Sequence, residues 1–150
     1  MNSKKSVENF LASKKIAVVG VSRKKQKFGN TVYRELKKKG YKAYPVNPYM
    51  RVVDGDICYP DISSIPDKPE AVLLSITPDK TEAIMPEILN AGIKKVWMQQ
   101  GSQSEVAVQF CEENGIDCVS NECILMFTET IEFIHKAHRF FRGVFGKLPQ

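Results

Sequence analysis

The sequence lacks any apolar run that approaches the roughly 20 consecutive residues needed to span a bilayer. Residues 1–10 also lack the apolar stretch and small-residue cleavage motif of a secretory signal, so we expect a cytoplasmic protein without a membrane segment. The cysteines form no C-x-x-C pair and no spacing typical of zinc ligands. We therefore expect four free thiols, at Cys58, Cys111, Cys118 and Cys123.

The patterns of common catalytic sites are also missing. We find no P-loop, no Ser-His-Asp set and no pair of carboxylates placed for acid–base catalysis. The only histidines, His135 and His138, share a predicted helix face and could bind a metal with Glu129 or Glu132. We favour a packing and surface role for them, because a metal site needs three or four protein ligands and the other donors here are exposed acids. We therefore predict neither catalytic residues nor a metal.

The chain does have an excess of basic residues, with 22 Lys and Arg against 17 Asp and Glu and a net charge of +5. The cations concentrate at residues 23–27 and 37–39. The second cluster ends a predicted helix, where cations complement the helix dipole. The first cluster follows a predicted strand, and it is either a solvated turn or a site for phosphate. No nucleic-acid fold motif accompanies these charges, so nucleic acid is an unlikely partner.

Residues 15–20 are the most informative segment, an apolar run rich in β-branched residues that ends at Gly20. This pattern is typical of an inner strand of a parallel sheet. A dinucleotide-binding turn would continue as G-x-G-x-x-G, with an acidic residue about 20 positions later. Here Ser22 and Lys25 replace the other two glycines, and Asn47 and Pro48 follow the next strand. We predict a turn that presents backbone N–H groups to the phosphate of a ligand other than NAD.

Predicted strands and helices alternate along the chain. After a short helix at 7–12 capped by Ser6, we expect strands at 15–20, 42–46, 71–76, 94–98 and 116–119. Helices are expected at 30–39, with Asn30 as its N-cap, and at 77–91, 104–114 and 121–142. Residues 48–67 form an irregular crossover with a short strand at 51–53. The pattern predicts a single α/β domain over residues 1–150: a doubly wound, Rossmann-like parallel sheet of about five strands, with helices on both faces.

In such a sheet, ligands bind beyond the carboxyl ends of the strands, where the strand order reverses. The segments that follow the predicted strands are residues 20–23, 47–48, 77–78, 99–101 and 120–123. Each segment alone is explained by turn formation. Together they supply hydroxyls, amides and two glycines, which suit hydrogen bonding to a flat, polar, phosphorylated ligand better than proton transfer.

These segments resemble the CoA-binding domain family, small Rossmann-type proteins related to the CoA-binding domain of the succinyl-CoA synthetase alpha subunit. The resemblance covers residues from about 14 to 126. Its markers are IAVVGVS at 16–22, FGN at 28–30, GY at 40–41, PVNP at 45–48, TP at 77–78, VWMQQG at 96–101, and Cys123. It implies a module that binds coenzyme A or an acyl-CoA without catalysis, as a carrier, sensor or regulatory unit.

The resemblance also implies which residues bind the ligand. The phosphate-facing loop would comprise Gly20, Val21, Ser22 and Arg23, with Lys27, Phe28 and Gly29 beside it. The nucleotide would be flanked by Asn47 and Pro48 and, on its adenine side, by Ile76, Thr77 and Pro78. Gln100, Gly101 and Cys123 would lie further along the cleft. The chain departs from many relatives at Glu122, where they carry a basic residue.

Cys123 is expected to open the last helix, where the helix dipole would make its thiol nucleophilic. A thiol there would form a mixed disulfide with coenzyme A or accept an acyl group. We favour the alternative, a buried cysteine without a chemical role, because cysteine is among the most buried residue types.

Two other functions stay open. The chain is alternatively a subunit or fragment of an acyl-CoA synthetase, or of an NAD-type enzyme, that needs a partner chain. Against these stand the absence of the second domain that carries the synthetases' phosphorylated histidine and the missing acidic residue. Nucleic-acid binding is the third possible function.

The last predicted helix carries several apolar residues that cover the core or contact a second copy or a partner protein. These are Phe133, Ile134, Phe140, Phe141 and Phe145.

Overall fold

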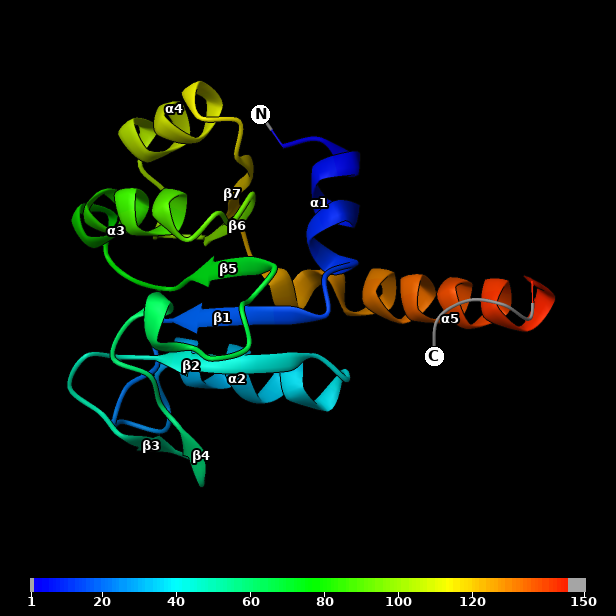
Figure 1. Cartoon of the computed structure of the whole chain (residues 1–150), viewed down its shortest axis with the longest axis horizontal. Coiled ribbons are helices and arrows are strands. Elements are labelled where there is room, and N and C mark those ends of the chain that lie inside the picture. Colours follow the sequence, from blue (N-terminus) through cyan, green and yellow to red (C-terminus); the bar gives the residue numbers. More distant parts are fainter. Residues whose placement is uncertain (1, 146–150) are drawn as a thin grey trace.

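A five-stranded parallel sheet lies at the centre of the computed structural model, which describes residues 2–145, with side chains for residues 2–127 and 129–137 (Figure 1). The strands are β1 (Lys15–Val19), β2 (Lys42–Val46), β5 (Ala71–Leu74), β6 (Lys95–Gln99) and β7 (Asp117–Glu122). They lie in the order β2-β1-β5-β6-β7, and all four neighbouring pairs are parallel. The predicted Rossmann-like, doubly wound fold is confirmed.

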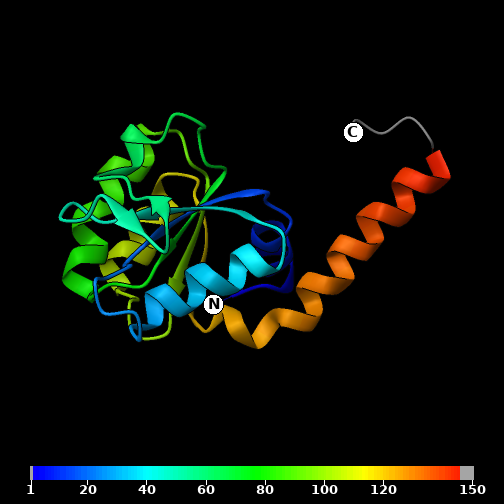
Figure 2. The same ribbon diagram turned by 90° about the horizontal axis from the view of Figure 1, so that it is seen from below.

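Helices cover both faces of the sheet (Figure 2). One face carries α1 (Lys4–Leu11), α2 (Phe28–Lys38) and α5 (Thr128–Phe145), and the other carries α3 (Pro78–Asn90) and α4 (Glu105–Glu113). Alternate strand residues pack into the two cores, as Val18 and Trp97 do on the first face and Val19 and Met98 on the second. Burial on both sides explains why the strands read as continuous apolar runs.

The crossover after β2 contains a hairpin that the sequence analysis predicted only in part. It consists of β3 (Val52–Val53) and β4 (Asp56–Ile57), joined by Asp54 and Gly55 with φ angles of 49° and 81°. An Asp-Gly pair with two positive φ angles is the usual two-residue hairpin turn. The outer face of the hairpin exposes Val52 and Ile57, whereas Val53 is buried.

Two predicted helix starts are wrong. Helix α1 begins at Lys4, because the Ser3 side chain, and not that of Ser6, caps it by accepting from the Ser6 N–H at 2.9 Å. Helix α2 begins at Phe28, so Asn30 lies inside the helix instead of at its cap. Its amide is buried and forms two hydrogen bonds to the Ser22 backbone in the preceding loop.

The final helix also begins later than predicted. A short 3-10 helix, η2 (Ile124–Phe127), precedes α5, and Cys123 therefore does not open a long helix. Strand β7 runs on to Glu122, past the predicted end at residue 119, whereas β5 stops at Leu74 instead of residue 76. The Ile76 N–H leaves the sheet because it donates to the Ser102 hydroxyl at 3.0 Å.

Helix α5 extends past the amino ends of the strands, away from the rest of the molecule (Figures 1 and 2). Its first turns pack through Ile131 and Ile134, whereas Phe133 is exposed. The predicted apolar contact residues Phe140, Phe141 and Phe145 lie outside the described side chains. Across the part of the chain that the structure describes, no helix is both long enough and apolar enough to cross a bilayer.

One buried polar atom offers a test of the packing on the second face. The Thr81 hydroxyl in α3 is fully buried and is the one buried side-chain N or O atom without a hydrogen-bond partner among the described residues. We expect Thr81→Val to raise the free energy of unfolding by about 1 kcal/mol, because the desolvation cost of the hydroxyl disappears while the shape is kept. Denaturant unfolding measures this, with Thr31→Val on the less buried α2 surface as the control. A destabilised Thr81→Val would contradict it.

Candidate functional site

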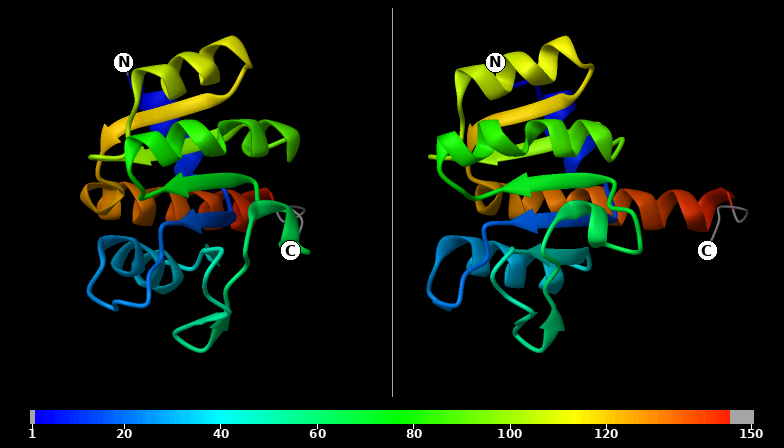
Figure 3. Two further views of the ribbon diagram at one scale, coloured as in Figure 1. Left: turned by 90° about the vertical axis from the view of Figure 1, so that its left-hand side faces the viewer. Right: turned by 60° about the vertical axis from the view of Figure 1, so that its left-hand side comes forward.

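The segments that follow the five parallel strands meet at one edge of the sheet, because all five carboxyl ends point the same way (Figures 1 and 3). The chain passes from β1 through α2 to β2 on one side, and later enters β5 on the other side of β1. The strand order therefore reverses between β1 and β5, which is where ligands bind in open α/β sheets.

Two glycines bring α2, β1 and β5 into close contact at this reversal point. Gly20 has a φ of +123°, and a Cβ atom there would lie 2.1 Å from the Ser75 carbonyl oxygen. A Cβ atom on Gly29 would lie 2.2 Å from the Gly20 carbonyl oxygen. Close helix–strand packing is the role of the third glycine in a dinucleotide-binding turn. Here Gly29 has that role, although the loop that separates it from Gly20 is longer than in the dinucleotide-binding pattern.

Residues 21–27, which we call the basic loop, are anchored by Asn30. Its Oδ1 accepts from the Ser22 N–H at 2.7 Å, and its Nδ2 donates to the Ser22 carbonyl at 2.7 Å. The asparagine is 1% exposed, so these bonds are shielded from water. The Ser22 N–H therefore points back to α2 and is already bonded. This role of Asn30 differs from the N-cap predicted for it.

The basic loop carries exposed cations that have no acidic partner among the residues that the structure describes. Of its cationic side chains, only that of Arg23 has a hydrogen bond, to the Tyr49 carbonyl at 3.0 Å. None of the four cations pairs with a carboxylate in the described part of the chain; they are Arg23, Lys24, Lys25 and Lys27. Other lysines are paired, for example Lys15 with Asp67 at 2.7 Å. The first turn of α2, which follows the loop, has no capping side chain. Unpaired cations and an open helix start together favour an anion.

Asn47 joins the end of β2 to the basic loop. Its Nδ2 donates to the Val21 carbonyl at 2.7 Å, and its Oδ1 accepts from the Tyr49 N–H at 2.7 Å. An NAD-binding protein would carry a carboxylate near this position to hold the ribose. Asn47 instead positions the loop, and Pro48 beside it is exposed.

The segment after β5 starts α3, with Thr77 at the N-cap and Pro78 in the first turn. A hydrogen bond from the Thr77 side chain lowers the pKa of the Asp79 carboxyl below its ordinary value. This end of α3 therefore already holds a negative charge, unlike the start of α2. Ile76 is tied to the next strand through the Ser102 hydroxyl.

Gln99 organises the far end of the edge; it was expected in a segment after a predicted strand but not among the ligand-binding residues. It is 1% exposed; its Oε1 accepts from the Ile124 N–H at 2.8 Å, and its Nε2 lies 3.7 Å from the Cys123 sulfur. These contacts fix the half-buried Cys123 just after β7. The neighbouring Gln100 and Gly101 are exposed, and the Gly101 N–H donates to the Gln103 side chain at 2.7 Å.

The predicted site residues thus form two groups along one edge, with Ile76, Thr77 and Pro78 after β5 between them. The basic loop and Asn47 are in direct contact, beside β1 and β2. Gly101 and Cys123 follow β6 and β7, and three strand spacings of about 4.8 Å separate β1 from β7, or about 14 Å. Only an elongated ligand contacts both groups.

Of the two histidines, the structure describes the side chain of His135. Within the described residues, no group of three or more His, Cys, Asp or Glu side chains is arranged to hold a metal. The His135 ring packs at a tilt against the Tyr41 ring, with centroids 5.3 Å apart and an interplanar angle of 58°. His138 of the predicted pair lies outside the described side chains.

The chain is similar to a known protein family and to several known proteins. A protein-family model described as "CoA binding domain" matches residues 14–129. Acetate–CoA ligase (ADP-forming) I of Archaeoglobus fulgidus is 24% identical over 135 residues, which cover 83% of this chain and 20% of that ligase. The uncharacterized protein YneT of Bacillus subtilis is 28% identical over 123 residues, covering 81% of this chain and 91% of YneT.

A hypothetical protein from Pyrococcus horikoshii OT3 is similar in structure, with a TM-score of 0.80 and 35% identity. The alignment covers 86% of this chain and 92% of that one. The chain therefore spans a fifth of the Archaeoglobus ligase, but nearly all of the smaller relatives.

Proposed function

The chain belongs to the CoA-binding domain family, and from this premise we propose that it binds coenzyme A or an acyl-CoA along the carboxyl edge of its sheet. The observation that carries the proposal is the set of four cations at the strand-order reversal that pair with no carboxylate among the described residues. Coenzyme A carries a pyrophosphate and a 3′-phosphate, which need such cations. In this proposal the chain acts as a binding module and not as a catalyst.

The charges at the edge support one orientation of the ligand. The phosphates lie beside the basic loop and the uncapped start of α2, because Asp79 makes the start of α3 unfavourable for anions. The pantetheine arm then runs across β5 and β6 towards Gly101 and Cys123. The length of this edge suits an extended molecule with a charged end and a thiol end.

A second candidate is a role as the CoA-binding part of an acyl-CoA ligase whose other domains lie on a separate chain. The relation to the Archaeoglobus ligase, of which this chain matches only 20%, favours it. Both candidates share the same binding site. They differ in whether acyl-CoA forms when acetate, ATP and coenzyme A are supplied together with a partner chain.

We expect saturating coenzyme A to raise the melting temperature by about 5–10 °C, because a ligand present at about 100 times its Kd stabilises the native state by about 2.7 kcal/mol. Acetyl-CoA is expected to act equally. Dephospho-CoA, which lacks the 3′-phosphate, is expected to give a smaller shift. NAD is expected to give almost none, because Asn47 replaces the ribose-binding carboxylate. Differential scanning fluorimetry measures all four, and equal shifts for NAD and coenzyme A would contradict the ligand assignment.

A further inference from the structure

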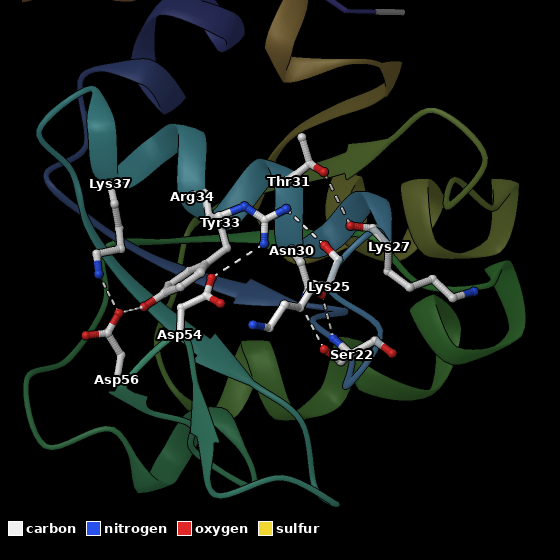
Figure 4. A network of polar contacts seen from close by, with 10 residues as sticks. All are labelled: Ser22, Lys25, Lys27, Asn30, Thr31, Tyr33, Arg34, Lys37, Asp54 and Asp56. Carbon is white, nitrogen blue, oxygen red and sulfur yellow. Dashed lines mark hydrogen bonds and ion pairs between the residues drawn. The ribbon is translucent and has the colours of Figure 1, made fainter.

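Helix α2 holds the basic loop at a second point, by way of Arg34 (Figure 4). The Arg34 Nη2 donates to the Lys25 carbonyl at 2.9 Å, in the middle of the loop. Its Nη1 lies 3.5 Å from the Asp54 carboxylate, at the turn of the β3–β4 hairpin. One guanidinium therefore joins three segments: the loop, the helix and the hairpin.

The hairpin is itself fixed to α2, so it is a firm anchor. The Asp56 carboxylate accepts hydrogen bonds from Lys37 and Tyr33, both of α2. The bond from Lys37, and then that from Tyr33, lowers the pKa of the Asp56 carboxyl below its ordinary value. Burial and the bond to Asp56 raise the pKa of the Tyr33 hydroxyl. Asp56 therefore stays ionised at neutral pH, and the hairpin keeps Asp54 in place beside Arg34.

The basic loop needs an external anchor because little holds it from within. Residues 23–26 form neither helix nor strand, and the backbone N–H bonds between loop residues are those from Lys24 to the Ser22 hydroxyl and from Lys27 to the Lys24 carbonyl. Neighbouring cations repel one another and spread an unanchored segment. A ligand that must first order such a loop binds more weakly.

We propose that Arg34 is a positioning residue, which bridges the Lys25 carbonyl and the Asp54 carboxylate and so holds the basic loop in the shape that receives the ligand's phosphates. This inference rests on the proposed function. Arginine suits the task because its planar guanidinium donates in two fixed directions at once, which a lysine ammonium does not.

Two substitutions separate positioning from simple attraction between charges. Arg34→Lys keeps the charge but removes the fork, and we expect coenzyme A affinity to fall about fivefold. Asp54→Asn makes the surroundings of the loop more positive, which by charge alone would strengthen phosphate binding. If Arg34 works as a bridge, Asp54→Asn instead weakens binding about threefold. Isothermal titration calorimetry with coenzyme A measures both, and Arg51→Lys, an exposed arginine of the same crossover, is the matched control with unchanged affinity.

Wild-type affinity in Arg34→Lys, or tighter binding in Asp54→Asn, would overturn the proposal. Hydrogen exchange of the ligand-free protein gives an independent measure. Arg34→Lys is expected to speed exchange at the Lys24 and Lys27 amides several-fold, while the Ser22 amide, held by Asn30, keeps its wild-type rate. Unchanged loop exchange also overturns the proposal. If the wild-type protein fails to bind coenzyme A, the proposed function fails, and the exchange data still decide whether Arg34 orders the loop.

Discussion

Gly20→Ala is expected to lower the free energy of unfolding by about 4 kcal/mol, the largest stability effect of any single substitution that we predict. Two causes add at this position. The backbone has a φ of +123°, which a residue with a Cβ atom rarely adopts, and the new atom would lie 2.1 Å from the Ser75 carbonyl oxygen. That oxygen belongs to the backbone after β5, so the clash is relieved only by separating β1 from β5. Denaturant unfolding measures the loss.

Two further glycines separate the causes. Gly29 has no positive φ, but its Cβ atom would lie 2.2 Å from the Gly20 carbonyl oxygen, so Gly29→Ala measures the contact alone. Gly40 has a φ of +95° and no heavy atom within 4 Å of the added carbon, so Gly40→Ala measures backbone strain alone. We expect losses of about 3 kcal/mol for Gly29→Ala and about 1–2 kcal/mol for Gly40→Ala. Alanine favours helices over glycine by about 1 kcal/mol, so a stabilised Gly29→Ala would contradict the proposed contact.

The importance of Gly20 and Gly29 shows what the sequence could and could not predict. The apolar run that ends at Gly20 predicted β1 and its turn, because a run of apolar, β-branched residues and a terminal glycine are local signals. Gly29 was not recognised as the packing glycine, because it stands further along the chain than the dinucleotide pattern places it. Its role follows from the approach of α2 to β1, which depends on the length and path of the loop between them.

The misplaced helix starts have a similar origin. Asn30 before an apolar stripe is a good local N-cap signal, yet its amide bonds to Ser22 across the loop, and α2 begins earlier. The start predicted for the last helix at residue 121 fails because buried Gln99 accepts from the Ile124 N–H. In both places a tertiary hydrogen bond to the backbone outweighs a local preference. The partners stand 8 and 25 residues apart, beyond the reach of a local capping pattern, so the fold is needed to identify them.

The largest expected effect on binding comes from removing the charge of the basic loop. Substitution of all four cations by glutamine, at Arg23, Lys24, Lys25 and Lys27, is expected to weaken coenzyme A binding about 100-fold. Stability should change little, because these side chains are exposed and have no carboxylate partners among the described residues. Calorimetric titration at several salt concentrations should also show a flatter dependence of affinity on salt, because fewer cations face the phosphates.

A matched variant decides whether this loss is local to the site. Glutamine at four exposed lysines away from the carboxyl edge removes the same charge; they are Lys5, Lys42, Lys94 and Lys136. Because exposed charges more than about 10 Å apart are largely screened at 0.1 M salt, we expect this variant to lose less than about threefold in affinity. Equal losses in the two variants would mean that the protein attracts any polyanion through its net charge of +5. An unchanged affinity in the loop variant would mean that the phosphates bind at another part of the edge and not beside the β1 turn.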